Sequence, residues 1–269
     1  MLRNKSSLIA LIVLMLLIVF SLIGPSFSSH TYYETNLAYK NLPPSPLHPF
    51  GTDELGRSIF VRIWWGARIS LFIGIAAALI DMIVGVFYGG ISALLGGKID
   101  EIMMRFADTL GSLPHLLIVI LLTVILEQGV STIIIAMTLT GWINMARIVR
   151  TQILTLKEQS FIQAARSIGA SKFRILTRHL IPNCFGVIIT TMTLTIPQAI
   201  FTEAFLSFLG LGVQAPIASW GTMASDGLSA LSFYPWRLFF PAAFISLTML
   251  AFNLLGDGLR DTLDPLSKS

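Results

Sequence analysis

Long apolar runs alternate with polar connections along most of the chain. Six of these runs approach or exceed the roughly 17–25 residues that a transmembrane helix needs. They cover Leu8–Ile23, Ile69–Leu95, Ala107–Leu126, Ser131–Ala146, Phe185–Leu209 and Leu238–Leu255. Pro114 interrupts the third run near its start. The pattern predicts an all-α integral membrane protein with six transmembrane helices, whose two termini lie on the same side of the membrane.

The first apolar run has two interpretations. Arg3 and Lys5 precede Leu8–Ile23, an order that is also typical of a secretory signal peptide, and Ser26–Ser28 resembles a weak cleavage site. We favour an uncleaved first helix, because five further apolar runs follow. The run has only 16 residues, but its flanking residues can complete a span.

A polar segment, residues 26–67, separates the first two runs, and we expect it outside the cytoplasm. Its first half is rich in Ser, Tyr, Asn and Pro, which indicates an extended linker. In its second half Thr52 is a suitable N-cap, with Asp53 and Glu54 in a favourable first turn. Apolar positions and arginines then lead to the Trp64-Trp65 pair. We expect an interfacial helix whose tryptophans lie at headgroup level.

The densest cluster of basic residues lies between two apolar runs, at Phe161–Asn183. Small and apolar residues recur there at helical spacing up to Gly169, which favours a left-handed turn, and Ser171 can cap a second helix. Pro182 fixes the backbone before the next membrane helix. The pattern predicts two short helices that present an Ala-rich face to another protein. The alternative is a basic amphipathic loop on lipid headgroups.

Composition supports the membrane assignment and gives the orientation. Hydrophobic residues make up 54% of the chain and charged residues 12%, with a mean hydropathy of +0.78. With a cytoplasmic N-terminus, 13 of the 18 Lys and Arg residues fall in cytoplasmic segments, which is the bias that the positive-inside rule describes. The net charge of +4 therefore reflects topology, and we expect no nucleic-acid partner. The single cysteine, Cys184, excludes an internal disulfide.

Two acidic residues, Asp81 and Glu203, lie well inside apolar runs. A charge at the centre of a membrane helix costs about 2.5–3.5 kcal/mol when it faces lipid, so both side chains should face protein or water. They are candidates for the translocation path, where either could contact a substrate's α-amino group. The alternative, an interhelical hydrogen bond, is the interpretation we favour for both. His115 and the three other histidines are scattered without ligand spacing, and they do not indicate a bound metal.

The basic segment resembles the cytoplasmic loop of ABC importer permeases, which the separate ATPase subunit binds. The family motif is Glu-Ala-Ala-x-x-x-Gly, followed after about nine residues by a hydrophobic pair and Pro; here it reads Gln163–Gly169 and His179–Asn183. Gln163 stands where the family has Glu. This replacement keeps the capacity for hydrogen bonding but removes one ion pair with an ATPase arginine. The resemblance implies an ATPase-coupling loop with the residues Phe161, Gln163, Ala164, Ala165, Arg166, Gly169, Ala170, His179, Pro182 and Asn183.

Three further stretches resemble the C-type permease subunit of dipeptide, oligopeptide and nickel importers. They are HPFGTDELGRSIFVRIWWGARIS at His48–Ser70, the Ser207–Gly212 turn and Asn253–Asp261. The resemblance implies a type I ABC importer permease fold in a bacterial or archaeal cell membrane, with both termini cytoplasmic. Its expected divisions are a first transmembrane helix (1–25), an extracytoplasmic segment (26–67), a permease core (68–257, with the coupling loop at 150–183) and a cytoplasmic tail (258–269).

The same resemblance implies partners and a substrate class. The partners would be a homologous second permease chain, two cytoplasmic ATPase subunits and an extracytoplasmic peptide-binding protein. The ATPase subunits would bind ATP and Mg²⁺, and we expect no cofactor in this chain. The implied substrate is a di- or oligopeptide, and nickel or another small solute is the alternative.

Two other classes of function fit the sequence less well. A secondary transporter or channel would carry more ionisable residues within the membrane and two matching halves, and neither is visible. An enzyme would need catalytic motifs such as a Walker phosphate loop, Gly-x-Ser-x-Gly or His-Glu-x-x-His, and the sequence contains none of these. We therefore expect a permease rather than an enzyme.

Overall fold

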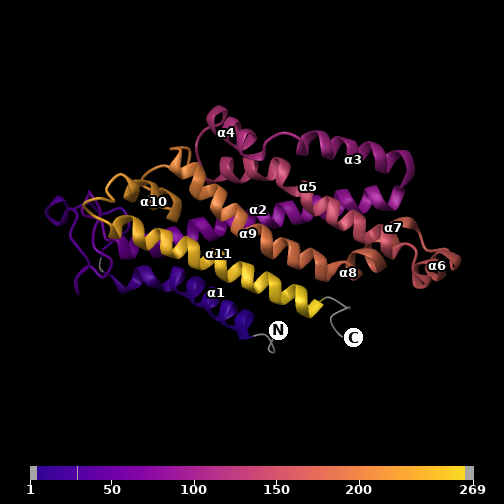
Figure 1. The fold of residues 1–269 in the computed structure, drawn as a ribbon, viewed down its shortest axis with the longest axis horizontal. Helices are drawn as coiled ribbons and strands as arrows, with labels where there is room; N and C mark the ends of the chain where they lie inside the picture. Colours follow the sequence, from indigo (N-terminus) through magenta and orange to yellow (C-terminus); the bar gives the residue numbers. More distant parts are fainter. Residues whose placement is uncertain (1–4, 29, 264–269) are drawn as a thin grey trace.

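The computed structural model describes residues 5–28 and 30–263, and within them it is helical apart from loops and one isolated bridge between Thr52 and Ser58 (Figure 1). In chain order the elements are α1 (Lys5–Ile23), η1 (Gly24–Phe27), η2 (Leu37–Tyr39), α2 (Ile59–Leu95), α3 (Gly97–Gly111), α4 (His115–Ile125), α5 (Val130–Leu156), α6 (Ser160–Ser167), α7 (Lys172–Ile175), the π-helical η3 (Leu176–Leu180), α8 (Ile181–Asn183), α9 (Phe185–Phe208), α10 (Trp220–Leu228) and α11 (Trp236–Leu263).

Within the described residues, five helices are long and apolar enough to cross a membrane: α1, α2, α5, α9 and α11. A sixth span results if α3 and α4 count as one bent pair. The candidate span Ala107–Leu126, which Pro114 interrupts, is not one straight helix, because α3 and α4 are bent by 73° relative to each other. Pro114 is the N-cap of α4, with extended backbone, so it starts a new helix instead of continuing the old one.

Three membrane helices extend beyond their apolar runs. Helix α2 begins at Ile59, α5 continues to Leu156 and α11 continues to Leu263. Hydropathy marks only the part of a helix that is apolar throughout, whereas the polar ends are helical because they pack on neighbouring elements. The divisions expected after residues 67 and 257 therefore fall inside α2 and α11, and 150–156 belongs to α5. Residues 264–269 of the expected tail lie outside the described residues.

The expected interfacial helix starting at Thr52 is wrong, since the helix begins only at Ile59. The Oδ1 atom of Asp53 accepts hydrogen bonds from the backbone N–H groups of Leu55 and Arg57, each at 2.9 Å. Gly56 takes a φ of +71°, which closes the turn. An acidic side chain that binds its own backbone in this way forms a turn and not a helix start.

The paired tryptophans, which were expected at headgroup level, pack against other aromatic rings. Trp64 is buried and stacks on Phe20, with ring centroids 5.2 Å apart. Trp65 stacks on Tyr32 at 4.1 Å. Both belong to α2, so this part of the segment is the first quarter of a long membrane helix.

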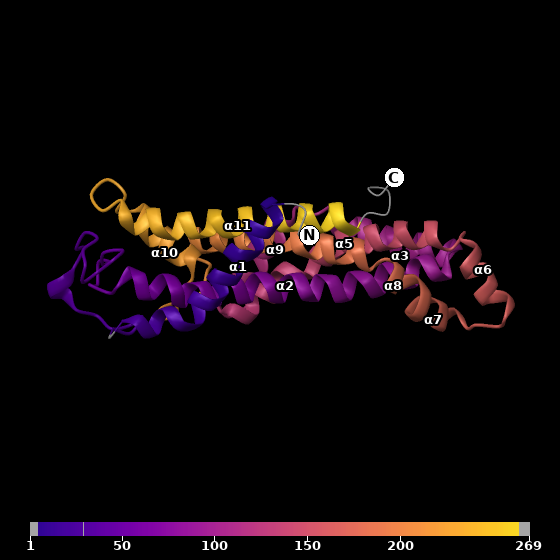
Figure 2. The same ribbon diagram turned by 90° about the horizontal axis from the view of Figure 1, so that it is seen from below.

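The helices form an elongated bundle with loops and short helices at both ends (Figures 1 and 2). One end holds the loops around η2 and α10, which meet where Trp236 Nε1 donates to the Thr52 carbonyl at 3.4 Å. The other end holds α6, α7 and α8. Ser7 Oγ donates to the Leu254 carbonyl at 3.2 Å, so the start of α1 lies beside the last part of α11. The first and last described helical turns therefore lie on the same side of the bundle.

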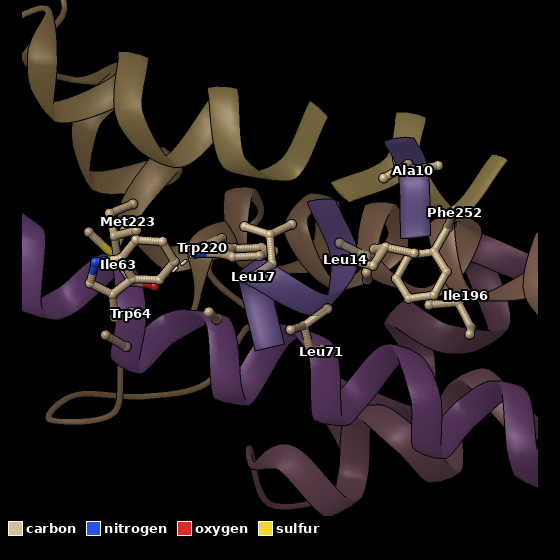
Figure 3. Packing of buried hydrophobic residues seen from close by; sticks show 14 of the residues in the cluster. Ala10, Leu14, Leu17, Ile63, Trp64, Leu71, Ile196, Trp220, Met223 and Phe252 are labelled. Carbon is tan, nitrogen blue, oxygen red and sulfur yellow. Dashed lines mark hydrogen bonds between the residues drawn. The ribbon is translucent and has the colours of Figure 1, made fainter. Parts of the chain in front are cut away.

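Buried hydrophobic residues from α1, α2, α9, α10 and α11 form one core, part of which is drawn in Figure 3. Trp220 lies at its centre, fully buried, and its indole N–H donates to the Ile63 carbonyl at 2.9 Å. This bond satisfies the one polar group of a large apolar ring. It fixes α10 against α2.

Helices α2 and α5 pack closely because small residues line their interface. A Cβ atom at Gly85 would lie 2.6 Å from Cβ of Met145, and one at Gly89 would overlap the Ala146 carbonyl group. Glycines four residues apart let two membrane helices approach backbone to backbone, which increases van der Waals contact where no hydrophobic effect drives association.

Candidate functional site: a coupling segment and a membrane cavity

The coupling segment, Phe161–Asn183, is a helix–turn–helix that projects from the end of the bundle between α5 and α9 (Figure 2). Gly169 has a φ of +80°, and Ser171 Oγ accepts a hydrogen bond from the Arg174 N–H at 3.3 Å. The predicted glycine turn and N-cap are therefore confirmed. The second helix is longer than expected, since α7 continues through η3 into α8.

Apolar side chains anchor the coupling segment to the membrane helices. Ile162, Leu176 and Leu180 are almost completely buried, and they share a core with Ile153 of α5 and Cys184. Cys184 thus packs as an apolar residue. A segment held by such a core moves together with the helix ends on which it packs.

The opposite face of the segment is an open apolar groove with a volume of about 350 Å³. Ile168 is 85% exposed, Phe161 is 42% exposed, and Ala164 is exposed between them. Its full lining is Phe161, Ala164, Ala165, Ile168, Ala170, Arg174 and His179. An exposed apolar surface with a basic rim is typical of a protein interaction site.

The remaining residues of the implied motif belong to the same segment but do not line the groove. Gln163 Nε2 donates to the Glu158 carbonyl at 3.3 Å, a bond that a carboxylate at this position could not form. Asn183 Nδ2 donates to the His179 carbonyl at 2.6 Å, and Pro182 lies in the first turn of α8. Arg166 is exposed. The segment is therefore pre-shaped, with its local hydrogen bonds satisfied and its apolar groove open.

A second site is a cavity of about 350 Å³ beside Asp81 of α2, which is open to the surface at the exposed side chains of Asn144 and Gln198. Helices α2, α4, α5, α9 and α11 contribute its walls. Its polar lining includes Asp81, His115, Asn144, Gln198 and Thr202. Asp81 is buried, and its Oδ1 atom has no hydrogen-bond partner among the described residues. The structure therefore gives Asp81 no interhelical hydrogen bond at that atom.

Glu203 lies outside this cavity's lining, in a separate buried network. Its carboxylate accepts hydrogen bonds from the hydroxyls of Ser219 at 2.6 Å, Ser207 at 2.9 Å and Ser70 at 3.1 Å. Ser70 Oγ also accepts from the Trp220 N–H at 3.1 Å. The arrangement ties α2, α9 and α10 together. The two acids that the sequence paired as path candidates therefore have different surroundings.

Sequence reasoning missed an ion pair that fixes the base of α5. Arg150 donates to both carboxylate oxygens of Asp100, each at 2.6 Å, and Ser92 Oγ donates to the same carboxylate at 2.5 Å. Lys157 Nζ donates to the Ala93 carbonyl at 2.7 Å. The residue types carry no local signal, because the partners lie far apart in the sequence. These bonds hold α5 to α2 and α3 next to the coupling segment.

The opposite end of the bundle carries a charge cluster, in whose ion pairs all side chains except that of Glu54 are largely buried. Asp53 pairs with Arg57 at 2.7 Å and lies 3.5 Å from Arg62, while Arg237 pairs with Glu54 at 3.2 Å. Asp226 on α10 faces the same arginines, and burial raises the pKa of its carboxyl group while the Arg62 charge lowers it. The cluster joins the long polar loop to α2, α10 and α11. Among the described residues, no group of three or more His, Cys, Asp or Glu side chains could hold a metal ion.

Comparison with known proteins identifies the class of protein that this fold and these sites define. The chain belongs to the family of binding-protein-dependent transport system inner membrane components, whose family model matches residues 81–269. A second model, the N-terminal TM domain of oligopeptide transport permease C, matches residues 1–44. The chain is thus a multi-pass membrane permease of the ABC importer type. The C-type resemblance and the helical fold class predicted from the sequence are confirmed.

Peptide transport permeases of other organisms are similar to nearly the whole chain. The oligopeptide transport system permease protein OppC of Bacillus subtilis is 61% identical over 97% of this chain and 86% of its own length. The dipeptide transport system permease protein DppC of the same organism is 57% identical over 98% of this chain and 82% of its own length. OppC of Escherichia coli K12 is 44% identical over 98% of this chain and 88% of its own length.

One solved structure confirms the fold. The inward-facing MetNI methionine ABC transporter contains a chain that matches with a TM-score of 0.61, covering 74% of this chain and 94% of that chain. The two sequences are 14% identical. This likeness shows a shared type I importer permease fold and carries no information about substrate.

Proposed function

We propose that this chain is the translocation subunit of an ATP-driven importer of di- or oligopeptides. The observation that carries the proposal is the open apolar groove on the coupling segment, at one end of a peptide-permease fold. Exposed Ile168 and Phe161 give a partner protein apolar area to bury, and Arg174 gives its rim a positive charge. The high identity to OppC and DppC supports peptides as the cargo.

The full importer in this proposal contains four kinds of chain. Two ATPase subunits bind ATP and Mg²⁺ and dock on the coupling segments, while this chain binds no cofactor and catalyses no reaction. A homologous second permease completes the membrane part, and a binding protein delivers peptide to the end formed by η2 and α10. Both termini of this chain lie in the cytoplasm, in line with the excess of Lys and Arg in those segments.

The groove is tested with two changes that leave the membrane helices intact. Ala164→Asp places a charge in the apolar groove, and Gly169→Pro forbids the φ of +80° and removes the N–H that donates to the Arg166 carbonyl at 3.0 Å. Ser160→Asp adds the same charge just outside the groove, at the start of α6, where an acidic residue is favourable. It is the matched control.

The readout is peptide uptake and binding-protein-stimulated ATP hydrolysis by the complete importer in proteoliposomes. We expect each groove variant to insert normally and to lose at least about tenfold in uptake. In Ala164→Asp one buried unpaired charge costs several kcal/mol, and in Gly169→Pro the turn that shapes the groove is lost. The Ser160→Asp control should behave as wild type. Normal uptake by both groove variants would contradict the docking assignment.

The substrate class is tested separately by deletion and complementation in cells. Loss of labelled dipeptide or pentapeptide uptake, restored by the intact gene, supports peptide cargo. The preferred peptide length then distinguishes a dipeptide importer from an oligopeptide importer. Selective loss of nickel uptake would overturn the peptide assignment while leaving the permease fold and coupling segment unchanged.

A further inference from the structure

The membrane cavity contains a buried carboxylate with an oxygen atom that lacks a hydrogen-bond donor among the described residues. Asp81 is 6% exposed, lies near the middle of α2, and lines the cavity of about 350 Å³. Its Oδ1 atom has no hydrogen-bond partner, and no Lys or Arg pairs with it within the described part of the chain. Burying an unpaired carboxylate is costly, so the site is incomplete without a cation or donor from outside.

Helix α5 is shaped around this carboxylate. Gly141 faces Asp81 directly, and a Cβ atom at position 141 would lie 2.7 Å from Asp81 Oδ1 and closer still to Oδ2. Only glycine leaves the carboxylate room in its present position. Gly141 also lines the cavity, so the contact between α2 and α5 that makes room for the Asp81 carboxylate also forms part of the cavity wall.

The neighbouring polar side chains offer acceptors and do not neutralise Asp81. His115 Nδ1 is 2.7 Å from Thr140 Oγ1, so this ring nitrogen is engaged elsewhere. Asn144 and Gln198 contribute side-chain amides to the lining, whose oxygens can accept hydrogen bonds, and Thr195 contributes a hydroxyl. The lining therefore combines one carboxylate with several neutral acceptors.

This set of acceptors distinguishes between kinds of cation. A divalent ion such as Mg²⁺ or Ca²⁺ prefers six or more oxygen ligands with several carboxylates or retained waters, and the cavity lining supplies a single carboxylate. A primary ammonium group carries three N–H donors and one charge, which a single carboxylate and two neutral acceptors satisfy. A peptide's α-amino group has a pKa of about 7.7–8.0 and is largely cationic at neutral pH.

We propose that the Asp81 cavity is a transient binding site for a primary ammonium group, and that in transport it receives the N-terminal ammonium of the peptide. The second half of this statement rests on the proposed peptide import. The volume of the cavity, about 350 Å³, is at the low end for small-molecule sites and suits the first residues of a peptide. The preference for a free amino terminus would then be set partly within the membrane and not only by the binding protein.

The ammonium preference is tested without any assumption about cargo. Cys184 is fully buried, so Thr195→Cys introduces the reactive thiol into the cavity of the assembled importer. Labelling rates are measured with aminoethyl methanethiosulfonate, which carries a primary ammonium, and with the neutral methyl reagent. We expect the ammonium-to-neutral rate ratio to fall at least about tenfold when Asp81→Asn is added, the effect of losing one charge-assisted hydrogen bond.

Two further variants keep this test decisive. Glu127→Gln removes an exposed carboxylate between α4 and α5 and should leave the ratio unchanged. Gly141→Ala keeps the Asp81 charge but displaces it, so the ratio should fall even if Asp81→Asn assembles poorly. An unchanged ratio in both the Asp81→Asn and Gly141→Ala backgrounds would overturn the proposal.

The peptide half is tested by uptake of one dipeptide with a free and with an N-acetylated amino terminus. Asp81→Asn should lower uptake of the free form and spare the acetylated form, with binding-protein-stimulated ATP hydrolysis retained. An equal loss for both forms would overturn the N-terminal assignment. If the labelling ratio depends on Asp81 but the importer carries no peptide, the ammonium site stands and the proposed cargo is wrong.

Discussion

Replacing Glu203 by Ala should destabilise the protein far more than replacing it by Gln. Glu203 is fully buried, and its two oxygens accept hydrogen bonds from three serine hydroxyls. In Gln the amide oxygen can still accept from Ser207 and Ser219, which both bind the same carboxylate oxygen, and the amide nitrogen can donate to Ser70. Ala leaves all three hydroxyls without this acceptor.

The magnitude follows from the number of bonds and the volume removed. Interhelical hydrogen bonds in membrane proteins contribute about 0.6 kcal/mol on average and at most about 1.7 kcal/mol each. Truncation of a buried side chain adds a cavity term. We expect Glu203→Ala to lower the free energy of unfolding by about 2–5 kcal/mol. Glu203→Gln should cost no more than about 1 kcal/mol, because shape and most hydrogen bonds remain.

Thermal unfolding of the purified protein in detergent measures the difference. With about 2–4 °C per kcal/mol for a chain of this size, Ala should lower the Tm by roughly 5–15 °C and Gln by less than about 4 °C. Glu127→Ala removes an exposed glutamate side chain and serves as the control. Equal destabilisation by Ala and Gln would refute the reasoning, since it would mean that the negative charge, and not the hydrogen-bond geometry, holds the three helices together.

Two other substitutions test contacts between elements. Gly89→Val should abolish stable folding, because its side chain would overlap the Ala146 carbonyl, whereas Gly129→Ala should be tolerated, since nothing lies within 4 Å of a Cβ atom there; the yield of monodisperse protein measures both. Asp53→Ala should leave Arg57 buried without its partner and make the loop that contains η2 sensitive to limited proteolysis, at a cost of about 3–5 kcal/mol. Wild-type protease resistance in Asp53→Ala would contradict this account of the charge cluster.

The sequence predicted the elements whose signals are local. Apolar runs predicted the membrane helices, and Gly169 and Ser171 predicted the turn and the N-cap of the coupling segment. These features could be predicted because a turn and an N-cap depend on adjacent residues. The same local signals failed at Asp53, which was expected to favour a helix start. Its carboxylate instead binds the N–H groups of Leu55 and Arg57, and a turn replaces the helix.

The sites inside the membrane could be predicted only as residue types. Apolar surroundings showed that Asp81 and Glu203 must face protein or water, yet the sequence treated them alike. Their difference comes from distant partners: Ser70 lies 133 positions from Glu203, and Gly141 is on another helix from Asp81. The periodicity of residues along one helix does not indicate which residue of a neighbouring helix lies opposite them.

The position of the coupling segment explains how movement at its groove can reach the Asp81 cavity. The segment connects the end of α5 to the start of α9, and both helices line the cavity, through Gly141 and Gln198 respectively. From Asn144 to Leu156, α5 is one unbroken helix, about 18 Å long at 1.5 Å per residue, so it transmits displacement as a rigid rod. A partner that moves the groove therefore acts on two walls of the cavity at once. Helix α2 is bonded to the end of α5 through Lys157 and the Ala93 carbonyl, and its other end is held by the buried arginine cluster. Opening and closing of the cavity then requires no hinge inside the membrane part of α5, and the one sharp bend nearby, between α3 and α4, leaves that rod intact.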